Sequence, residues 1–490
     1  MTTTPSIPTA ETVWTNKLYS DGWRAGSAGT IDVIEPATGE VLATVGAASP
    51  NEVATAAKSA LVAQAKWAAM LPNDRAAILF KAAEIFEKAV PEMSLFIARE
   101  TGGLLAKGQR EVHAAAHIVQ AAASMPLQPQ GLVLPQMTGN FNFAQRVPRG
   151  VIAVISPFNF PLILSIRAVA PALAVGNAVI LKPDPQTPIG GGLFIAKVFE
   201  EAGLPEGLLH VLPGGADVGE ALCTDPNISM VSFTGSTAAG RKVGEICGRH
   251  LKKVALELGG KNPLIVLDDA DVDVAASNAA WGSYLFQGQI CMSTGIVFAH
   301  AAIAEKLTAK LSEKAKGLRI GNPATEQVAI GPMINQRQRD RVHAIVQEAV
   351  QQGAKLAAGG TYKDLFYAPT VLSGVRPGMR AFEEEIFGPV AVVVTIASDD
   401  EAVALANQSA YGLAAGILSK DVGRAMALGQ RLKIGLLHIN DQTVKDDHVN
   451  PFGGRGASGN GSSIGGPGDW EEFTQWQWVT MKKHATAYPF

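Results

Sequence analysis

Cysteine and charge are both scarce in this chain. Only three cysteines, Cys223, Cys247 and Cys291, occur among its 490 residues. They form no CxxC pair, which excludes a disulfide framework and a cysteine zinc cluster and favours a reducing cytoplasm. We expect no metal. Charged residues make up 17% of the chain, against about 25% in typical globular proteins, so we expect a large apolar core.

Basic runs and targeting signals are lacking as well. The 41 Lys and Arg residues nearly balance the 44 Asp and Glu residues, so nucleic acid is not expected as a partner. The first residues, MTTTPSIPTAETVW, contain no basic region and no apolar stretch. They are more typical of a loose arm than of a signal peptide.

One apolar stretch, residues 151–181, is long enough to cross a membrane. Pro157, Pro161, Pro171 and Arg167 divide this stretch. Such interruptions favour a buried strand-helix-strand unit over a transmembrane helix. We therefore expect no membrane partner.

Short apolar runs alternate with helical segments between residues 150 and 257. The five runs are VIAVI, AVILK, LLHVL, MVSFT and KVALE. This alternation is typical of a doubly wound parallel sheet in an α/β fold. A second α/β stretch follows to about residue 440, with the runs PLIVL, AVVVTI and GLLHI and with helices near 271–287 and 302–316.

Outside these two stretches the patterns differ. The chain before residue 125 is mostly helical, with a capping box from Ser49 to Glu52. A hairpin at 125–147 and a tail at 471–490 alternate apolar and polar residues, as β-strands do. Trp476 and Trp478 in the tail would lie on an exposed edge, which invites pairing with another subunit.

These patterns predict three parts of the chain. They are a first α/β domain from residues 1–124 and 148–256, a second α/β domain from 257–457, and oligomerisation segments at 125–147 and 471–490.

Polar residues follow the runs of the first sheet. Ligands bind outside the carboxyl ends of parallel strands, so these positions are candidate site residues. They bring Asn159, Lys182, Gly235-Ser236 and Glu257 to one edge. Ser236 opens a helix whose free N–H groups suit a phosphate, although serine is equally an ordinary N-cap.

Common nucleotide motifs are absent. The segment from Gly235 to Lys242 resembles a phosphate-binding loop, but Arg241-Lys242 stands where Lys-Ser/Thr is required. Nucleotide hydrolysis therefore loses support. No GxGxxG follows the first strand of the sheet, so the usual dinucleotide fingerprint is missing too.

The three cysteines lie in different contexts. Cys247 lies inside an amphipathic helix and Cys223 near the end of a short helix, as small buried apolar residues do. Cys291 follows Gln287-Gly288-Gln289-Ile290, in polar sequence after a helix. The residues alone leave burial and nucleophilic reactivity equally open for Cys291.

A set of motifs in fixed order resembles the aldehyde dehydrogenase superfamily over essentially the whole chain. The matching stretches are PFNFP, LKP, FTGS, LELGGKNP, QGQ-x-C, EEIFGPV and PFGG. The stretches VLPGGADVGE, GRHLKKVALELGG, HINDQ and the terminal YPF look more narrowly like bacterial benzaldehyde dehydrogenases of aromatic catabolism.

The resemblance implies a reaction and three catalytic residues. Cys291 would add to the aldehyde carbon and give a thiohemiacetal, whose oxyanion Asn159 and the backbone N–H of Cys291 would stabilise. Hydride transfer to NAD, or to NADP, would leave a thioester. Glu257 would then activate the water that releases the carboxylic acid.

The same resemblance assigns the binding residues. Lys182 and Glu385 would hold the two riboses of the cofactor, and Ser236 with Gly235 would meet its pyrophosphate. Phe387 and Phe158 would complete the cofactor site. Phe160, Arg167 and Phe452 would line the substrate tunnel. The first domain would bind the cofactor, the second would be catalytic, and the protein would be a cytoplasmic homodimer or homotetramer.

Two positions depart from the family. Pro185 stands where NAD-preferring relatives commonly carry a glutamate that binds the adenosine ribose, which leaves the choice between NAD and NADP open. Arg167 stands where many relatives carry a large aromatic residue. It would lie over an aromatic substrate, attract a ring substituent, or form an ion pair at the edge of the core.

Other functions stay open at this level. Salicylaldehyde, vanillin or semialdehyde oxidation depends on the shape of the tunnel. A non-catalytic protein of the same fold would be expected to lack Cys291, Glu257 or Asn159, and all three are present. A thiol hydrolase would normally need a histidine beside its cysteine, and no histidine flanks Cys291 or Glu257.

Overall fold

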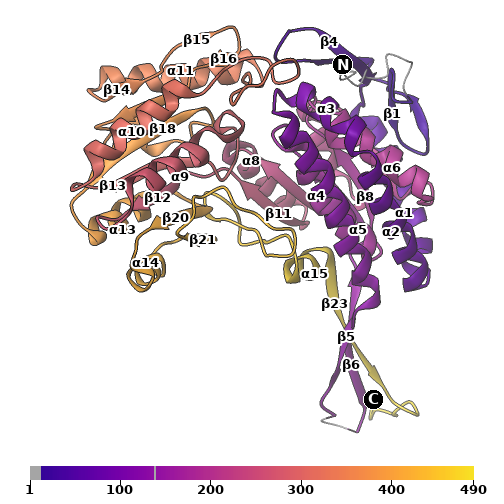
Figure 1. Cartoon of the computed structure of the whole chain (residues 1–490). Helices are drawn as coiled ribbons and strands as arrows, with labels where there is room; N and C mark the ends of the chain where they lie inside the picture. The colour runs from indigo at the N-terminus through magenta and orange to yellow at the C-terminus, as the bar shows by residue number, and fades with distance from the viewer. Residues whose placement is uncertain (1–12, 137–138) are drawn as a thin grey trace.

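Two seven-stranded sheets, each covered by helices, form the body of the molecule (Figure 1). The structure is a computed structural model that describes residues 13–136 and 139–490. The first sheet has the strand order β11-β10-β7-β8-β9-β1-β2. Its five parallel strands are β7 (Val151–Ile155), β8 (Ala178–Lys182), β9 (Leu209–Val211), β10 (Ile228–Gly235) and β11 (Lys253–Leu258). They are the five apolar runs predicted from the sequence.

Short strands that the sequence did not predict precede the helices of the first part. The antiparallel strands β1 (Lys17–Tyr19) and β2 (Trp23–Ala25) extend the first sheet, and β3 (Thr30–Ile34) pairs with β4 (Val41–Gly46). These strands have three to six residues and are largely exposed or half-buried. They therefore lack the continuous apolar runs that marked the buried strands.

The helical prediction is right from residue 50 onward. The helices around the first sheet are α1 (Pro50–Ala69), α2 (Pro72–Lys88), α3 (Val90–Thr101), α4 (Leu105–Ser124), α5 (Pro161–Ala174), α6 (Phe194–Ala202), α7 (Ala216–Thr224) and α8 (Thr237–Arg249). The Glu52 carboxylate accepts a hydrogen bond from the Ser49 N–H at 2.8 Å, as the capping box predicts. Cys223 and Cys247 are buried in the core between these helices and the sheet.

The second sheet has the order β14-β17-β18-β13-β12-β20-β21, and all its pairings except β14 with β17 are parallel. Its strands are β12 (Asn262–Val266), β13 (Thr294–His300), β14 (Lys355–Ala358), β17 (Thr370–Ser373), β18 (Val390–Ile396), β20 (Ala414–Leu418) and β21 (Leu436–Ile439). Its helices are α9 (Val272–Tyr284), α10 (Ala304–Gly317), α11 (Gln336–Gln351), α12 (Arg380–Glu383), α13 (Asp399–Gln408) and α14 (Val422–Gly429). A last helix, α15 (Pro467–Phe473), precedes the C-terminal strand.

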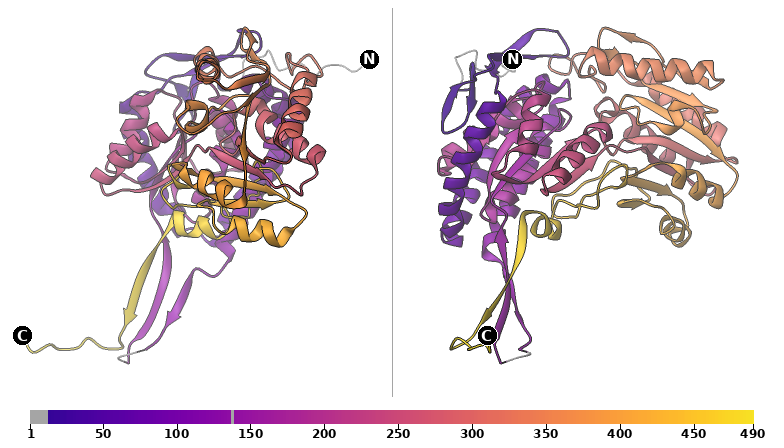
Figure 2. Two further views of the ribbon diagram at one scale, coloured as in Figure 1. Left: turned by 90° about the vertical axis from the view of Figure 1, so that its left-hand side faces the viewer. Right: turned by 180° about the vertical axis from the view of Figure 1, so that it is seen from behind.

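A third, three-stranded sheet projects away from the body (Figures 1 and 2). It joins β5 (Gly131–Leu134) and β6 (Phe141–Pro148) to the tail strand β23 (Thr474–Met481). Strand β23 pairs antiparallel with the whole of β6, from Thr474 opposite Pro148 to Met481 opposite Phe141. The predicted hairpin and tail strand are thus confirmed, and they form one sheet.

The long apolar stretch folds inside the first domain. Residues 151–181 form β7, α5 and most of β8, whose strand residues are all buried. Within the described part of the chain, none of the helices combines the length and apolarity needed to cross a membrane.

Candidate active site

A cavity of about 630 Å³ lies between the two large sheets. Its walls come from α4, the start of α5, the segment from Leu285 to Met292, and the loop from Val444 to Phe452. It brings together five residues predicted from the sequence: Asn159, Phe160, Arg167, Cys291 and Phe452. Lys107, Trp281 and Phe286 also line it, and sequence reasoning missed them.

Cys291 follows a strained turn. Phe286, Gln287 and Gly288 have φ angles of +48°, +55° and +65°, which the first two residue types rarely adopt. This turn ends the predicted helix at 271–287 early, after Tyr284. Gln287 holds the turn because its Nε2 donates to the carbonyls of Gly102 at 2.9 Å and Pro332 at 2.7 Å. Such strain is typical of functional sites.

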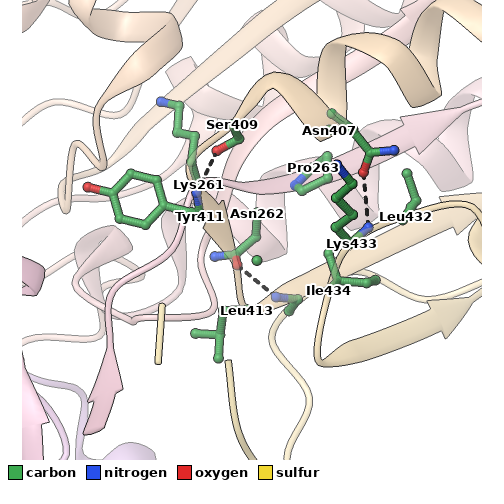
Figure 3. Close-up of a pocket in the computed structure, with 13 residues that line it drawn as sticks. Lys261, Asn262, Pro263, Asn407, Ser409, Tyr411, Leu413, Leu432, Lys433 and Ile434 are labelled. Atoms are coloured by element: carbon green, nitrogen blue, oxygen red, sulfur yellow. Dashed lines mark hydrogen bonds between the residues drawn. The ribbon is translucent and has the colours of Figure 1, made fainter. Parts of the chain in front are cut away.

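Asn262 fixes the other side of the cysteine loop. Its Nδ2 donates to the carbonyls of Cys291 and Ser293, both at 2.8 Å. Its Oδ1 accepts from the Ala414 N–H at 3.0 Å. Asn262 also lines a second, much smaller pocket together with Lys261 and Tyr411 (Figure 3). The backbone at Cys291 is thus tied to β12 through Asn262. Cys291 is partly exposed, unlike Cys223 and Cys247.

The surroundings of Cys291 favour its protonated form. Burial raises the pKa of the Cys291 thiol to about 12, and the nearby carboxyl groups of Glu385 and Glu257 add to the effect. A thiol in this state is weakly nucleophilic until a base takes its proton or a positive charge approaches.

Glu257 is a buried carboxyl group close enough to Cys291 to raise the pKa of its thiol. It lies in β11 and is 5% exposed. Neither carboxyl oxygen has a hydrogen-bond partner among the residues that the structure describes. Burial raises its pKa well above the ordinary value, while the Arg167 guanidinium opposes the shift. An unpaired carboxyl group with a raised pKa is a stronger base than an ordinary carboxylate and is suited to take a proton from water.

Asn159 lies between β7 and α5 and faces the same loop. Its Nδ2 donates to the Gln289 carbonyl at 3.0 Å, which ties it to the segment carrying Cys291. An amide nitrogen carries two hydrogens, so one remains for a ligand in the cavity. Asn159 is 3% exposed, and its position is therefore fixed by packing as well.

Of the three roles that the sequence left open for Arg167, the structure shows the ion pair. Its guanidinium bonds the Asp446 carboxylate at 2.9 and 3.3 Å and is 7% exposed. The same guanidinium lies 4.8 Å from the centre of the Phe452 ring. Arg167 therefore closes one wall of the cavity, with its charge already balanced by the protein.

The predicted cofactor residues lie at the carboxyl edge of the first sheet. Ser236 caps α8, where its Oγ accepts from the Ala239 N–H at 3.3 Å, and Gly235 ends β10. Lys182 ends β8 and is 7% exposed, and burial lowers its pKa against the opposing charges of Asp184 and Asp217. A capped helix start and a buried cation fit the phosphate and ribose groups of a dinucleotide.

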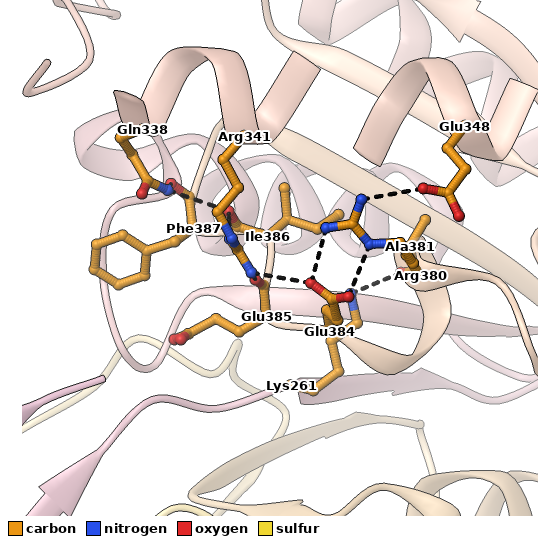
Figure 4. Close-up of polar contacts among 10 residues, drawn as sticks. All are labelled: Lys261, Gln338, Arg341, Glu348, Arg380, Ala381, Glu384, Glu385, Ile386 and Phe387. Carbon is orange, nitrogen blue, oxygen red and sulfur yellow. Dashed lines mark hydrogen bonds and ion pairs between the residues drawn. The ribbon is translucent and has the colours of Figure 1, made fainter. Parts of the chain in front are cut away.

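Glu385 and Phe387 lie in a loop that α11 holds by side-chain hydrogen bonds (Figure 4). Arg341 donates to the carbonyls of Glu385 at 2.8 Å and Ile386 at 2.9 Å, and Gln338 donates to the carbonyl of Phe387 at 2.9 Å. Phe387 has a φ of +58°. This loop is thus kept in a strained form by the bonds from α11.

The loop places a carboxylate and a ring against residues that follow β11 and β7 of the first sheet. The Glu385 carboxylate accepts from the Gly260 N–H at 3.1 Å, and burial raises its pKa to about 7. A side chain on Gly259 would collide with this carboxylate, because a Cβ there would lie 2.1 Å from Oε2. The Phe387 and Phe158 rings meet edge to face with centres 6.0 Å apart. A buried carboxylate beside two rings suits a ribose and a nicotinamide.

Comparisons with known proteins identify the family. The model of the aldehyde dehydrogenase family matches residues 23–479. Vanillin dehydrogenase from Amycolatopsis is 52% identical over 97% of this chain and 98% of its own length. Benzaldehyde dehydrogenase [NAD(+)] from Pseudomonas putida is 48% identical over 98% of each.

Solved structures share the fold over the same length. A salicylaldehyde dehydrogenase from Pseudomonas putida, complexed with salicylaldehyde, superposes with a TM-score of 0.93 at 35% identity, over 97% of this chain and 99% of its own. A betaine aldehyde dehydrogenase from Staphylococcus aureus in complex with NAD+ has a TM-score of 0.94 at 28% identity, over 97% and 96%. The chain belongs to the aldehyde dehydrogenase family.

Proposed function

We propose that this protein oxidises aromatic aldehydes to carboxylic acids with NAD. The observation that carries the proposal is the cavity, in which Cys291 and Asn159 lie among the rings of Phe160, Phe286 and Phe452. An apolar, ring-lined cavity with a few polar groups at one point favours a flat aromatic substrate whose polar end reaches those groups. Relatives named for vanillin and benzaldehyde support the same substrate class.

The first chemical step is the addition of the Cys291 sulfur to the aldehyde carbon. The carbonyl oxygen becomes an oxyanion, which the free N–H of Asn159 and the Cys291 backbone N–H stabilise. The thiol proton leaves to solvent water as the carbon–sulfur bond forms. The cofactor, when bound, supplies the hydride acceptor that turns this adduct into a thioester.

The second step is hydrolysis of the thioester. Water needs a base to attack it, and Glu257 is the buried, unpaired carboxyl group available in β11. Its proton uptake releases the acid and returns Cys291 to the thiol.

The cofactor residues follow from the same proposal. Lys182 and Glu385 hold the two riboses, and Ser236 with Gly235 meets the pyrophosphate at the start of α8. Phe387 and Phe158 pack at the nicotinamide end. The first sheet would then belong to the cofactor domain and the second to the catalytic domain. Three free cysteines suit a reducing compartment, so we place the reaction in the cytoplasm.

Absorbance of the reduced nicotinamide tests this function directly. Benzaldehyde and a short aliphatic aldehyde are each offered with NAD and with NADP. We expect the highest kcat/KM with benzaldehyde and NAD. Cys291→Ala should abolish turnover, and the matched Cys223→Ala variant should keep most of it. Turnover that survives in Cys291→Ala, or no cofactor reduction with any aldehyde, would refute the proposal.

A further inference from the structure

Lys107 places a charged group in the aromatic wall of the cavity. It lies on α4, its side chain is 7% exposed, and it lines the same cavity as Cys291. Its Nζ lies 4.6 Å from the centre of the Phe160 ring and 4.3 Å from that of Phe286. Phe160 and Cys291 pack against one apolar cluster that contains Phe286. The reaction proposed above gives Lys107 no part.

A buried ion pair anchors this lysine. Nζ bonds Glu111 Oε1 at 2.5 Å, and Glu111 Oε2 accepts from the Leu162 N–H at 3.1 Å, in the first turn of α5. The pair is therefore tied to the segment that carries Asn159 and Phe160. Gly103 packs against the lysine stem, since a Cβ there would lie 2.5 Å from Lys107 Cδ. The ammonium group is held in one place.

One donor of this ammonium group remains for a ligand. An ammonium group carries three N–H donors. One meets Glu111, and a second meets Thr101 Oγ1 at 3.4 Å. Among the described residues no acceptor is present for the third. Leaving a buried donor unpaired is unfavourable, and an oxygen on a bound molecule would satisfy it.

We propose that Lys107 is a specificity-determining residue that donates a hydrogen bond to a hydroxyl or phenolate oxygen on the ring of the aromatic aldehyde. This inference rests on the proposed function and narrows its substrate class to ring-hydroxylated benzaldehydes.

Wild-type selectivity gives the first test. The three hydroxybenzaldehydes are compared with the methylbenzaldehydes of the same ring position, which have nearly the same shape but no hydroxyl group. A site with an unpaired N–H donor should prefer at least one hydroxy isomer over its methyl counterpart by about tenfold in kcat/KM, equivalent to about 1.4 kcal/mol. Equal kcat/KM values for every hydroxy and methyl pair would overturn the inference.

Substitution of Lys107 gives the second test. Lys107→Met alone leaves Glu111 buried without its cation, so the double variant Lys107→Met/Glu111→Gln, which removes both charges, is made beside it. We expect either folded variant to lose the hydroxyl preference, about tenfold, with benzaldehyde kcat/KM changed less than about twofold. Lys310→Met, which removes an exposed lysine paired with Asp273, is the matched control. An equal loss with benzaldehyde would show a merely structural role and overturn the inference.

Calorimetry separates this inference from the proposed function. The preferred hydroxybenzaldehyde is titrated into Cys291→Ala, with and without Lys107→Met, so that no turnover is needed. A tenfold weaker Kd with Lys107→Met supports the subsite even if no cofactor is reduced. An unchanged Kd overturns the subsite even if benzaldehyde is oxidised normally.

Discussion

Cys291, the proposed nucleophile, lies in surroundings that keep its thiol protonated. Only the thiolate reacts, and a pKa of about 12 leaves very little of it at neutral pH. We therefore expect the rate of Cys291 alkylation by iodoacetamide, in the cofactor-free protein, to rise about tenfold per pH unit from pH 7 to 10. Peptide mapping by mass spectrometry identifies the modified cysteine. A plateau near pH 8.5, as in a free cysteine, would contradict the shift.

Kinetics can distinguish the deacylation role proposed for Glu257 from a purely structural role. Glu257→Gln keeps the size of the side chain but removes its ability to take a proton from water. We expect a burst of reduced cofactor near one per site, followed by a stall, because acylation still occurs and deacylation does not. Rapid-mixing absorbance measures the burst. A folded variant that is slow without a burst would show that the deacylation role is wrong or incomplete.

Pro185 bears on the choice of cofactor. It stands three residues after Lys182, and its side chain offers no acceptor for a ribose hydroxyl. The carboxylate of the neighbouring Asp184 accepts a hydrogen bond from the Gln186 N–H at 2.9 Å. Pro185→Glu would add a carboxylate that accepts from the 2′-hydroxyl and repels a 2′-phosphate. We expect the NAD to NADP ratio of kcat/KM to rise about tenfold, or about 1.4 kcal/mol. An equal loss with both cofactors and an intact fold would contradict this.

At the scale of elements, α11 supports the loop of the proposed cofactor site but does not line the substrate cavity. Arg341 holds the carbonyls of Glu385 and Ile386, and an arginine hydrogen bond of this kind contributes about 1.5 to 3 kcal/mol. Arg341→Met should release the strained loop and raise the KM for NAD about tenfold, with little change in cofactor-free alkylation of Cys291. Arg339→Met, in the same helix, is the matched control because Arg339 contacts Asp340 and Asp364 instead. Equal KM values in the two variants would show that the loop needs no such support.

At the scale of the molecule, we expect the projecting sheet to bind another subunit. Val133 is 75% exposed and Trp478 70% exposed, on strands that extend beyond the body (Figure 2). Large exposed apolar residues on an edge favour association. We expect light scattering at micromolar concentration to give two or four times the mass of one chain, and Val133→Lys/Trp478→Lys to shift it toward one. A wild-type monomer would refute the predicted oligomerisation role.

Much of this fold was readable in the sequence because its signals are local. A buried parallel strand is a continuous apolar run, so all five parallel strands of the first sheet were predicted, whereas the short, half-exposed strands of residues 17–46 were not. The helix expected to reach residue 287 ends after Tyr284 because Gln287 is bonded to Gly102 and Pro332, residues far along the chain. Such contacts leave no periodic signal.

The candidate site divides in the same way. The ends of parallel strands pointed to Asn159 and Glu257, since parallel strands must bring their carboxyl ends to one edge. The family resemblance pointed to Cys291. Only the tertiary structure decided that Arg167 pairs with Asp446, 279 positions away, and that Lys107 faces the rings of Phe160 and Phe286. The spacing of Lys107 and Glu111, four residues apart on one helix face, is the local sequence feature that fits their buried ion pair. The sequence determined which groups are candidates for the chemistry, because motifs are local, and long-range packing determined which of these groups are still free to meet a substrate.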